Sequence, residues 1–188
     1  MSHETLFHDT LEKAHREHGV TMTSKDKKLV TLWKIIDKFL KVITFGKMNQ
    51  FLTHYTTTLG RTIYRPVGWT MDNITGFDYA LLCHEIKHVK QQEDLGGDWF
   101  AFGSFLFAIL YLFVPFPIGL AYFRYKYERE AYRISWYSSL EVGITPDLDY
   151  YIERMTGAPY VWAWPFKRSV EKWFRKNCRI IEPINADT

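Results

Sequence analysis

An uncharged stretch, residues 99–123, restricts the fold more than any other feature of the sequence. Its 25 residues, WFAFGSFLFAILYLFVPFPIGLAYF, contain no Asp, Glu, Lys or Arg, and an apolar run of this length is sufficient for a helix that crosses a bilayer. Pro115 and Pro117 lie inside it, and proline interrupts helical hydrogen bonding. Taken alone the stretch would be a transmembrane helix, and the alternative is a helix to about Val114 that is followed by a sharp turn and a second helix.

Length and composition predict a single domain. A chain of 188 residues, 47% of them hydrophobic, is long enough to form one hydrophobic core and too short to form two domains that each have a core of ordinary size. We expect a polar, loosely packed N-terminal arm at 1–23, the domain at 24–179 and a C-terminal tail at 180–188. The net charge of +3 gives no sign of nucleic acid, and no nucleic-acid partner is expected. Two cysteines far apart and a polar N-terminus predict a reducing, cytoplasmic location.

The periodicity of the remaining residues predicts an α+β fold that is mainly helical. Two short strands are expected around Leu59-Gly60, ending before Pro66, and they form the only convincing β-element. Ser24 and Thr75 are the predicted N-caps of two helices, and Thr75 forms a capping box with Asp78. Besides the uncharged stretch, helices are expected over 25–45, 76–95, 118–143, 147–155 and 166–178.

The motif His84-Glu85-Ile86-Lys87-His88 lies in the middle of the helix predicted after Thr75. Residues four apart on a helix lie one turn above each other, so His84 and His88 can direct both imidazoles at one metal ion. Glu85 is offset around the helix, where it can take a proton from a metal-activated water and return it to a leaving group. This spacing predicts a zinc-dependent hydrolase with Zn²⁺ as cofactor. The alternative is a pair of buried, hydrogen-bonded histidines without a metal.

Two histidines leave such a zinc site one protein ligand short. The other histidines lie near the N-terminus, where a solvated face is expected, or at His54 in a predicted strand. Glu128 and Glu130 follow the uncharged stretch on the next long helix. They either include the third ligand or form ordinary i,i+4 ion pairs with Arg124 and Lys126 on a wet surface.

Two segments together carry a family pattern: His84-Glu85-x-x-His88-Val89-x-Gln91-Gln92 and, 40 residues after His88, Glu128-x-Glu130-Ala131. This pattern resembles the gluzincin group of zinc metallopeptidases, in particular the compact bacterial minigluzincin-like proteins, over residues 57–135. The resemblance implies that Glu128 is the third zinc ligand, that Glu130 is a surface residue, and that the substrate is a peptide or protein. Tyr132 stands where such enzymes usually have Asp or Asn to steady a zinc-binding histidine.

The same resemblance implies that TTTLGRTIYRP contains an edge strand on which an extended peptide is laid by backbone hydrogen bonding. The alternative is an ordinary edge strand protected by Arg61, Arg65 and Pro66. Support for a developing oxyanion needs a further donor, and Tyr160 and His54 are the candidates.

A zinc site that includes Glu128 also restricts the path of residues 99–123. A single membrane crossing would carry Glu128 away from the two histidines, so a helical hairpin with a turn at residues 114–117 is expected. The hairpin is either buried in protein or inserted in one leaflet, and its aromatic residues, Tyr111 among them, and the basic segment 167–179 suit peripheral membrane contact. The rival hypothesis is a non-catalytic membrane-surface or interaction protein with a structural zinc site.

Overall fold

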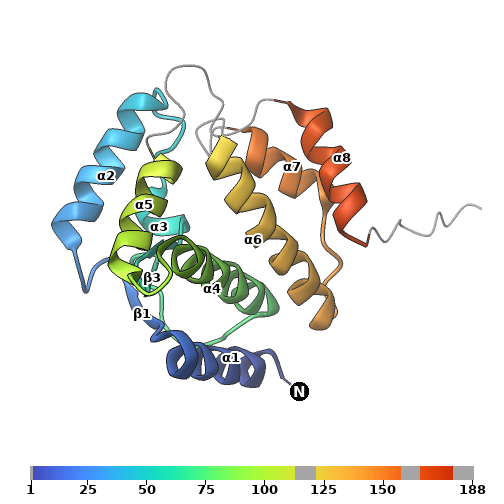
Figure 1. The fold of residues 1–188 in the computed structure, drawn as a ribbon, viewed down its shortest axis with the longest axis horizontal. Helices are drawn as coiled ribbons and strands as arrows, with labels where there is room; N and C mark the ends of the chain where they lie inside the picture. The colour runs from blue at the N-terminus through green and yellow to red at the C-terminus, as the bar shows by residue number, and fades with distance from the viewer. Residues whose placement is uncertain (1, 113–121, 158–165, 180–188) are drawn as a thin grey trace, which may run out of the picture.

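The computed structural model describes residues 2–112, 122–157 and 166–179, and it has the predicted α+β class with a mainly helical content (Figure 1). The helices are α1 (His3–His18), α2 (Val30–Ile43), α3 (Phe51–His54), α4 (Gly76–Gly96), α5 (Phe100–Leu112), α6 (Tyr122–Glu141), α7 (Leu148–Thr156) and α8 (Lys167–Asn177). The strands are β1 (Thr21–Ser24), β2 (Thr57–Leu59) and β3 (Thr62–Arg65).

Helix α4 occupies the centre of the fold and packs against α1, α5 and α6 (Figure 1). The predicted capping box starts it: the Thr75 hydroxyl accepts from the Asp78 N–H, and the Asp78 carboxylate accepts from the Thr75 N–H. Leu82 and Val89 on its core-facing stripe are fully buried. One helix is thus held from several sides, which fixes the direction of its remaining side chains.

The N-terminal segment packs tightly, so the loose arm predicted for residues 1–23 is not what the structure shows. Phe7 of α1 is fully buried and belongs to one hydrophobic cluster with Leu82 and Val89 of α4. His18 and Glu93 join the ends of the same two helices through a side-chain hydrogen bond of 2.7 Å. The expectation followed the polar composition of the segment, but a helix needs only one apolar face in order to pack.

The small sheet has the order β1-β3-β2, in which β3 is parallel to β1 and antiparallel to β2. The two strands predicted around Leu59-Gly60 are confirmed, and Gly60 makes the turn with a φ of +59°. Strand β1 was not predicted, and Ser24 is its last residue rather than the N-cap of α2. Gln92 of α4 donates to the Gly60 carbonyl at 3.3 Å, which holds the turn of this hairpin beside α4.

Helices α5 and α6 are the two arms of the predicted helical hairpin, and they contact each other as well as α4. The predicted turn at 114–117 lies outside the described residues. Within the part of the chain that the structure describes, no helix is both long and apolar enough to cross a membrane. The C-terminal helices α7 and α8 are confirmed and share a core with α6 that includes Trp136, Tyr151 and Phe174.

The backbones of α4 and α5 approach each other closely at Gly96 and Gly103. A Cβ atom on Gly103 would lie 2.1 Å from the carbonyl oxygen of Gln92 and 2.6 Å from the backbone nitrogen of Gly96. Neither backbone atom can move without displacing a helix, so only glycine fits at this crossing. The crossing fixes the path of α5, which carries Tyr111 toward α6.

Replacement of Gly103 by Ala should therefore lower the free energy of unfolding by about 2–3 kcal/mol, the usual cost of forcing extra atoms into a packed contact. Chemical denaturation followed by circular dichroism measures the change. Ser104→Ala on the same helix adds no atoms, and because the buried Ser104 hydroxyl has no hydrogen-bond partner among the described residues, this change should not lower stability. Equal stability of the Gly103→Ala variant and the wild type would contradict the close crossing.

Candidate metal centre

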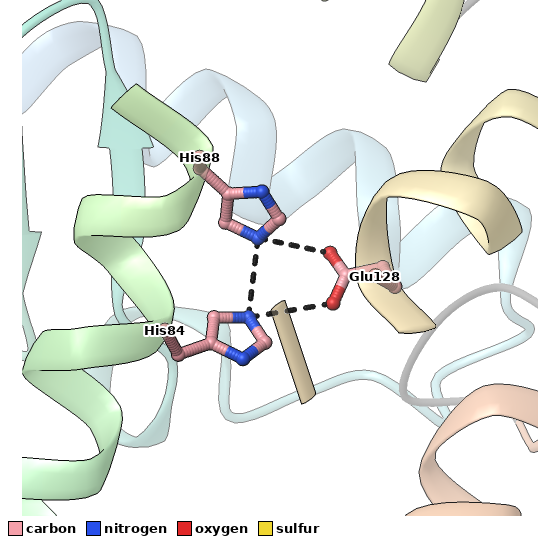
Figure 2. A group of neighbouring side chains, drawn as sticks. All are labelled: His84, His88 and Glu128. Carbon is pink, nitrogen blue, oxygen red and sulfur yellow. Dashed lines mark hydrogen bonds and ion pairs between the residues drawn. The ribbon is translucent and has the colours of Figure 1, made fainter. Parts of the chain in front are cut away.

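His84 and His88 project from α4 toward Glu128 on α6, as Figure 2 shows. The two Nε2 atoms lie 3.1 Å apart. The carboxylate oxygens of Glu128 lie 3.4 Å from Nε2 of His84 and 3.5 Å from Nε2 of His88. All three residues are buried, with exposed fractions of 3%, 6% and 2%. In the described residues this is the one group of three His, Cys, Asp or Glu side chains with metal-ligand spacing.

The distances within this group agree with a tetrahedral metal site. Ligand atoms about 2.0–2.1 Å from a tetrahedral zinc ion lie about 3.3–3.4 Å from one another. The separation of the two Nε2 atoms, 3.1 Å, is close to that value, and each of them has one oxygen of the Glu128 carboxylate at a similar distance, Oε2 at 3.4 Å from His84 and Oε1 at 3.5 Å from His88. In addition, Oε2 of Glu128 is buried and has no hydrogen-bond partner among the described residues. A buried carboxylate oxygen without a donor is costly, and a cation in this position would satisfy it.

Neighbouring side chains fix which nitrogen of each histidine faces the centre. The amide nitrogen of Gln91 donates to the Tyr127 carbonyl at 3.1 Å, so its oxygen is left to accept from Nδ1 of His88 at 2.9 Å. Ser135 donates to the Ala131 carbonyl and can accept from Nδ1 of His84 at 3.2 Å. With both Nδ1 atoms as donors, Nε2 of each ring faces Glu128, and this is the nitrogen that would bind a metal once it carries no proton.

Two tyrosines complete the surroundings of the site. The Tyr111 hydroxyl, on α5, donates to Oε1 of Glu128. Burial and the Glu128 charge raise the pKa of Tyr111 well above its usual value, so the phenol remains a donor. Tyr132 packs edge-on against the His84 ring with a centroid distance of 4.7 Å. It therefore constrains the ring by packing, while Ser135 is the hydrogen-bonding partner of His84 Nδ1.

The charges of the centre depend on one another. Burial is the largest single influence and lowers the pKa of His88, but the charge and hydrogen bond of Glu128, the Glu85 charge and the Gln91 hydrogen bond together outweigh it and raise this pKa to about 9. Burial likewise would raise the pKa of the Glu128 carboxyl, yet the two histidines hold it well below its usual range. Near neutral pH and without a metal, the site therefore holds an ionised carboxylate and a proton on His88.

Glu85 is also buried, with 5% of its surface exposed, and its charge acts on His88. The Thr58 hydroxyl on β2 donates to Oε2 of Glu85 at 2.6 Å. This bond fixes one carboxylate oxygen and leaves the other with acceptor capacity. The expected general base is thus held between α4 and the β2 strand, next to the histidine pair.

The other predicted site residues lie elsewhere. Glu130 is partly exposed and pairs with Lys87 at 3.5 Å, so the structure brings Glu128 to the histidines and leaves Glu130 at the surface. His54 is exposed at the end of the short helix α3, where its ring contacts the Thr53 hydroxyl at 2.8 Å. It is in a helix rather than the predicted strand and does not join the group. Tyr160 lies outside the described residues.

Several residues that shape the centre were not assigned to it from the sequence. Gln91 lies three positions after His88, and Ser135 lies seven after Glu128, so helical spacing alone places each on the ligand-bearing face. Tyr111 was considered only as one of the aromatic residues of the uncharged stretch that suit a membrane interface. Thr58 had no sequence signal, since its contact with Glu85 spans 27 positions.

Substitution of Glu128 tests the ligand set. Glu128→Gln keeps the shape of the side chain but removes the charge, and zinc affinity should fall by more than about 100-fold, because loss of outer hydrogen bonds alone costs about 10–100-fold. The measurement is competition with a chromophoric chelator. Glu130→Gln, two residues away on the same helix, is the matched control: Glu130 accepts only a long bond of 3.4 Å from Gln91, so zinc affinity should change by less than about tenfold. The reverse ranking would assign the ligand to Glu130.

Zinc binding should release the proton held on His88. Below pH 9 the proton must leave before Nε2 can bind a metal, so the apparent affinity should fall by about tenfold per pH unit on acidification, before any change in the other ligands. Calorimetric titrations at pH 7 in two buffers of different ionisation enthalpy measure the release, and about one proton per zinc is expected. Binding without proton release would contradict a protonated His88 in the metal-free site.

Comparisons of the chain with protein-family models, curated proteins and solved structures find no match. The likeness to gluzincins accordingly rests on the His84-Glu85-x-x-His88 helix and Glu128, and the properties of that group apply to this chain only as proposals.

Proposed function

We propose that the protein is a zinc-dependent hydrolase that cleaves peptide bonds. The observation that carries the proposal is the buried group of His84, His88 and Glu128, with Glu85 beside it on the same helix. A structural zinc site normally has four protein ligands, whereas a catalytic one has three and leaves a position open. Three ligands together with an adjacent carboxylate are the components of metal-assisted hydrolysis.

Zinc suits the donor set better than the other common ions. Two imidazole nitrogens and one carboxylate oxygen are typical of zinc, whereas Mg²⁺ and Ca²⁺ prefer oxygen ligands and more of them. When bound, zinc would polarise the substrate carbonyl and lower the pKa of water. His84, His88 and Glu128 would hold the ion, and Gln91 and Ser135 would keep the two rings in the binding tautomer.

Glu85 has the position of a general base. It would take a proton from the attacking water through the oxygen that Thr58 does not occupy, and then return it to the leaving amine. The low exposure of Glu85 limits competing contact with bulk water. Tyr111 is the described hydroxyl donor nearest the ligand carboxylate, and its bond to Glu128 would hold that ligand in place. His54 and Tyr160 remain untested as oxyanion donors.

The position of β2 favours a peptide over a small molecule as substrate. β2 is an edge strand of the described sheet, because its only partner there is β3. Thr58 on this strand contacts Glu85, so an extended peptide paired with the free edge would pass close to the base. Arg65, considered as protection for this edge, is instead buried on β3 in an ion pair with Asp78.

Exchange of Glu85 for Gln tests the proposal. Zinc content should remain at the wild-type level, while hydrolysis of labelled casein or a quenched peptide library should fall by about 10²–10⁴-fold, the usual contribution of a general base. Asp94→Asn, an exposed carboxylate-to-amide change on the same helix, is the control and should leave activity unchanged. Full zinc content without peptidase activity in the wild type would favour the non-catalytic alternative with a structural zinc.

A further inference from the structure

Helix α2 carries a stripe of large apolar side chains on its outward face. Leu32, Ile35, Phe39 and Val42 are separated by three, four and three residues, so they follow one face of the helix. Their exposed fractions are 37%, 61%, 60% and 68%, and Phe45, just beyond the helix, is 91% exposed. Single exposed apolar residues are ordinary, but four aligned on one helix face, with a fifth just beyond its end, mark a surface suited to binding a partner.

The rest of the fold determines which way this stripe faces. Trp33 is 2% exposed and packs against Tyr64 and Phe51 with ring centroids 4.7 and 6.3 Å away. This contact takes up the opposite side of α2, which lies at the periphery of the fold (Figure 1). A rotation that buried Phe39 would expose Trp33 in exchange. The stripe is therefore held outward by the packing of the domain.

Positive charge is concentrated beside the stripe. Lys25 is buried beside Trp33 and Phe51 and is left out of the count. Residues 26–47 contain six Lys and two Asp, a net charge of +4, while the whole chain has +3, so the remaining residues sum to −1. At 100° per residue, Lys34, Lys38 and Lys41 lie between the buried face and the apolar stripe, and all three are exposed. Lys41 pairs with Asp37 at 2.7 Å.

We propose that α2 is an in-plane docking helix that binds the surface of an anionic lipid bilayer. Aromatic and aliphatic side chains on one face with lysines alongside are the features of interfacial helices, which combine apolar insertion with attraction to acidic headgroups. Fourteen residues, about 21 Å of helix, are too short to span a bilayer but sufficient to lie along one.

One other occupant of the stripe and one other membrane-binding helix fit the observations less well. As an occupant, a second copy of the chain would bring two lysine-rich faces together, and like charges oppose such contact. Helix α8 is also basic, but its apolar residues Val170 and Phe174 are fully buried in the core, so it offers charge without a free apolar face. The paired apolar and basic character thus selects α2 as the docking element and lipid as its partner.

Co-sedimentation with vesicles tests the proposal. The full-length protein should bind vesicles of phosphatidylcholine with about one third phosphatidylserine and not vesicles of phosphatidylcholine alone. Ile35→Gln combined with Phe39→Gln should weaken partition by at least about tenfold, since each removes a side chain that enters the bilayer. Lys34→Gln combined with Lys38→Gln should weaken it by about thirtyfold.

Matched controls distinguish membrane binding by α2 from nonspecific hydrophobic adsorption and from unfolding. Phe77→Gln removes an exposed phenylalanine of comparable exposure, 69%, from α4 and should bind vesicles like the wild type. Thermal melting should show that each variant is folded. The proposal is overturned if the wild type ignores anionic vesicles, if Lys172→Gln with Lys176→Gln on α8 abolishes binding while the α2 variants do not, or if sedimentation shows a dimer that the α2 substitutions dissociate.

Discussion

The carboxylate of Glu128, buried between α4, α5 and α6, is the interaction on which the rest of the structure depends. An ionised carboxyl that is 2% exposed is tolerated only if charge and hydrogen bonds compensate for lost water. His88 supplies positive charge from α4, with His84 beside it, and Tyr111 supplies a hydroxyl from α5. The compensation therefore requires three helices to meet in one arrangement, so the same contacts organise the fold and form the candidate site.

Helix α5 connects this site to the backbone geometry of the domain. Its crossing with α4 at Gly96 and Gly103 is close enough to exclude a side chain, and two turns further on Tyr111 contacts Glu128. Arg124 of α6 donates to the Tyr111 carbonyl at 2.9 Å, which ties the end of α5 back to α6. The uncharged stretch resembles a membrane span in sequence, but its first part forms α5, and the Tyr111 hydroxyl on this helix donates to the buried carboxylate of Glu128.

The sequence predicted the local features well because each has a short-range cause. The Thr75–Asp78 capping box, the face shared by His84 and His88, and the turn at Gly60 all follow from residues within a few positions of one another. The choice of Glu128 over Glu130 came from the family resemblance, and the structure separates them by burial and by the partner of each.

Features that depend on distant contacts were not accessible from the pattern. The bond from Thr58 to Glu85 and the pairing of β1 with β3 need the complete topology. In the sequence Tyr111 lies among apolar residues, and only the packing of α6 against α5 brings its hydroxyl to Glu128. The N-terminal segment was expected to be loose, since its polar composition hides the single buried face that Phe7 anchors. In each case packing between residues far apart in the sequence, rather than local propensity, determines where the residue or segment lies.

We propose that His84, His88 and Glu128 bind one zinc ion together. X-ray absorption at the zinc edge of stoichiometrically loaded protein tests it most directly, because it reports the atoms around the ion. The account predicts one zinc per chain with two imidazole nitrogens and carboxylate oxygen at about 2.0–2.2 Å, and no sulfur. A sulfur shell at about 2.3 Å, from Cys83 or Cys178, or substoichiometric zinc without imidazole scattering, would contradict it.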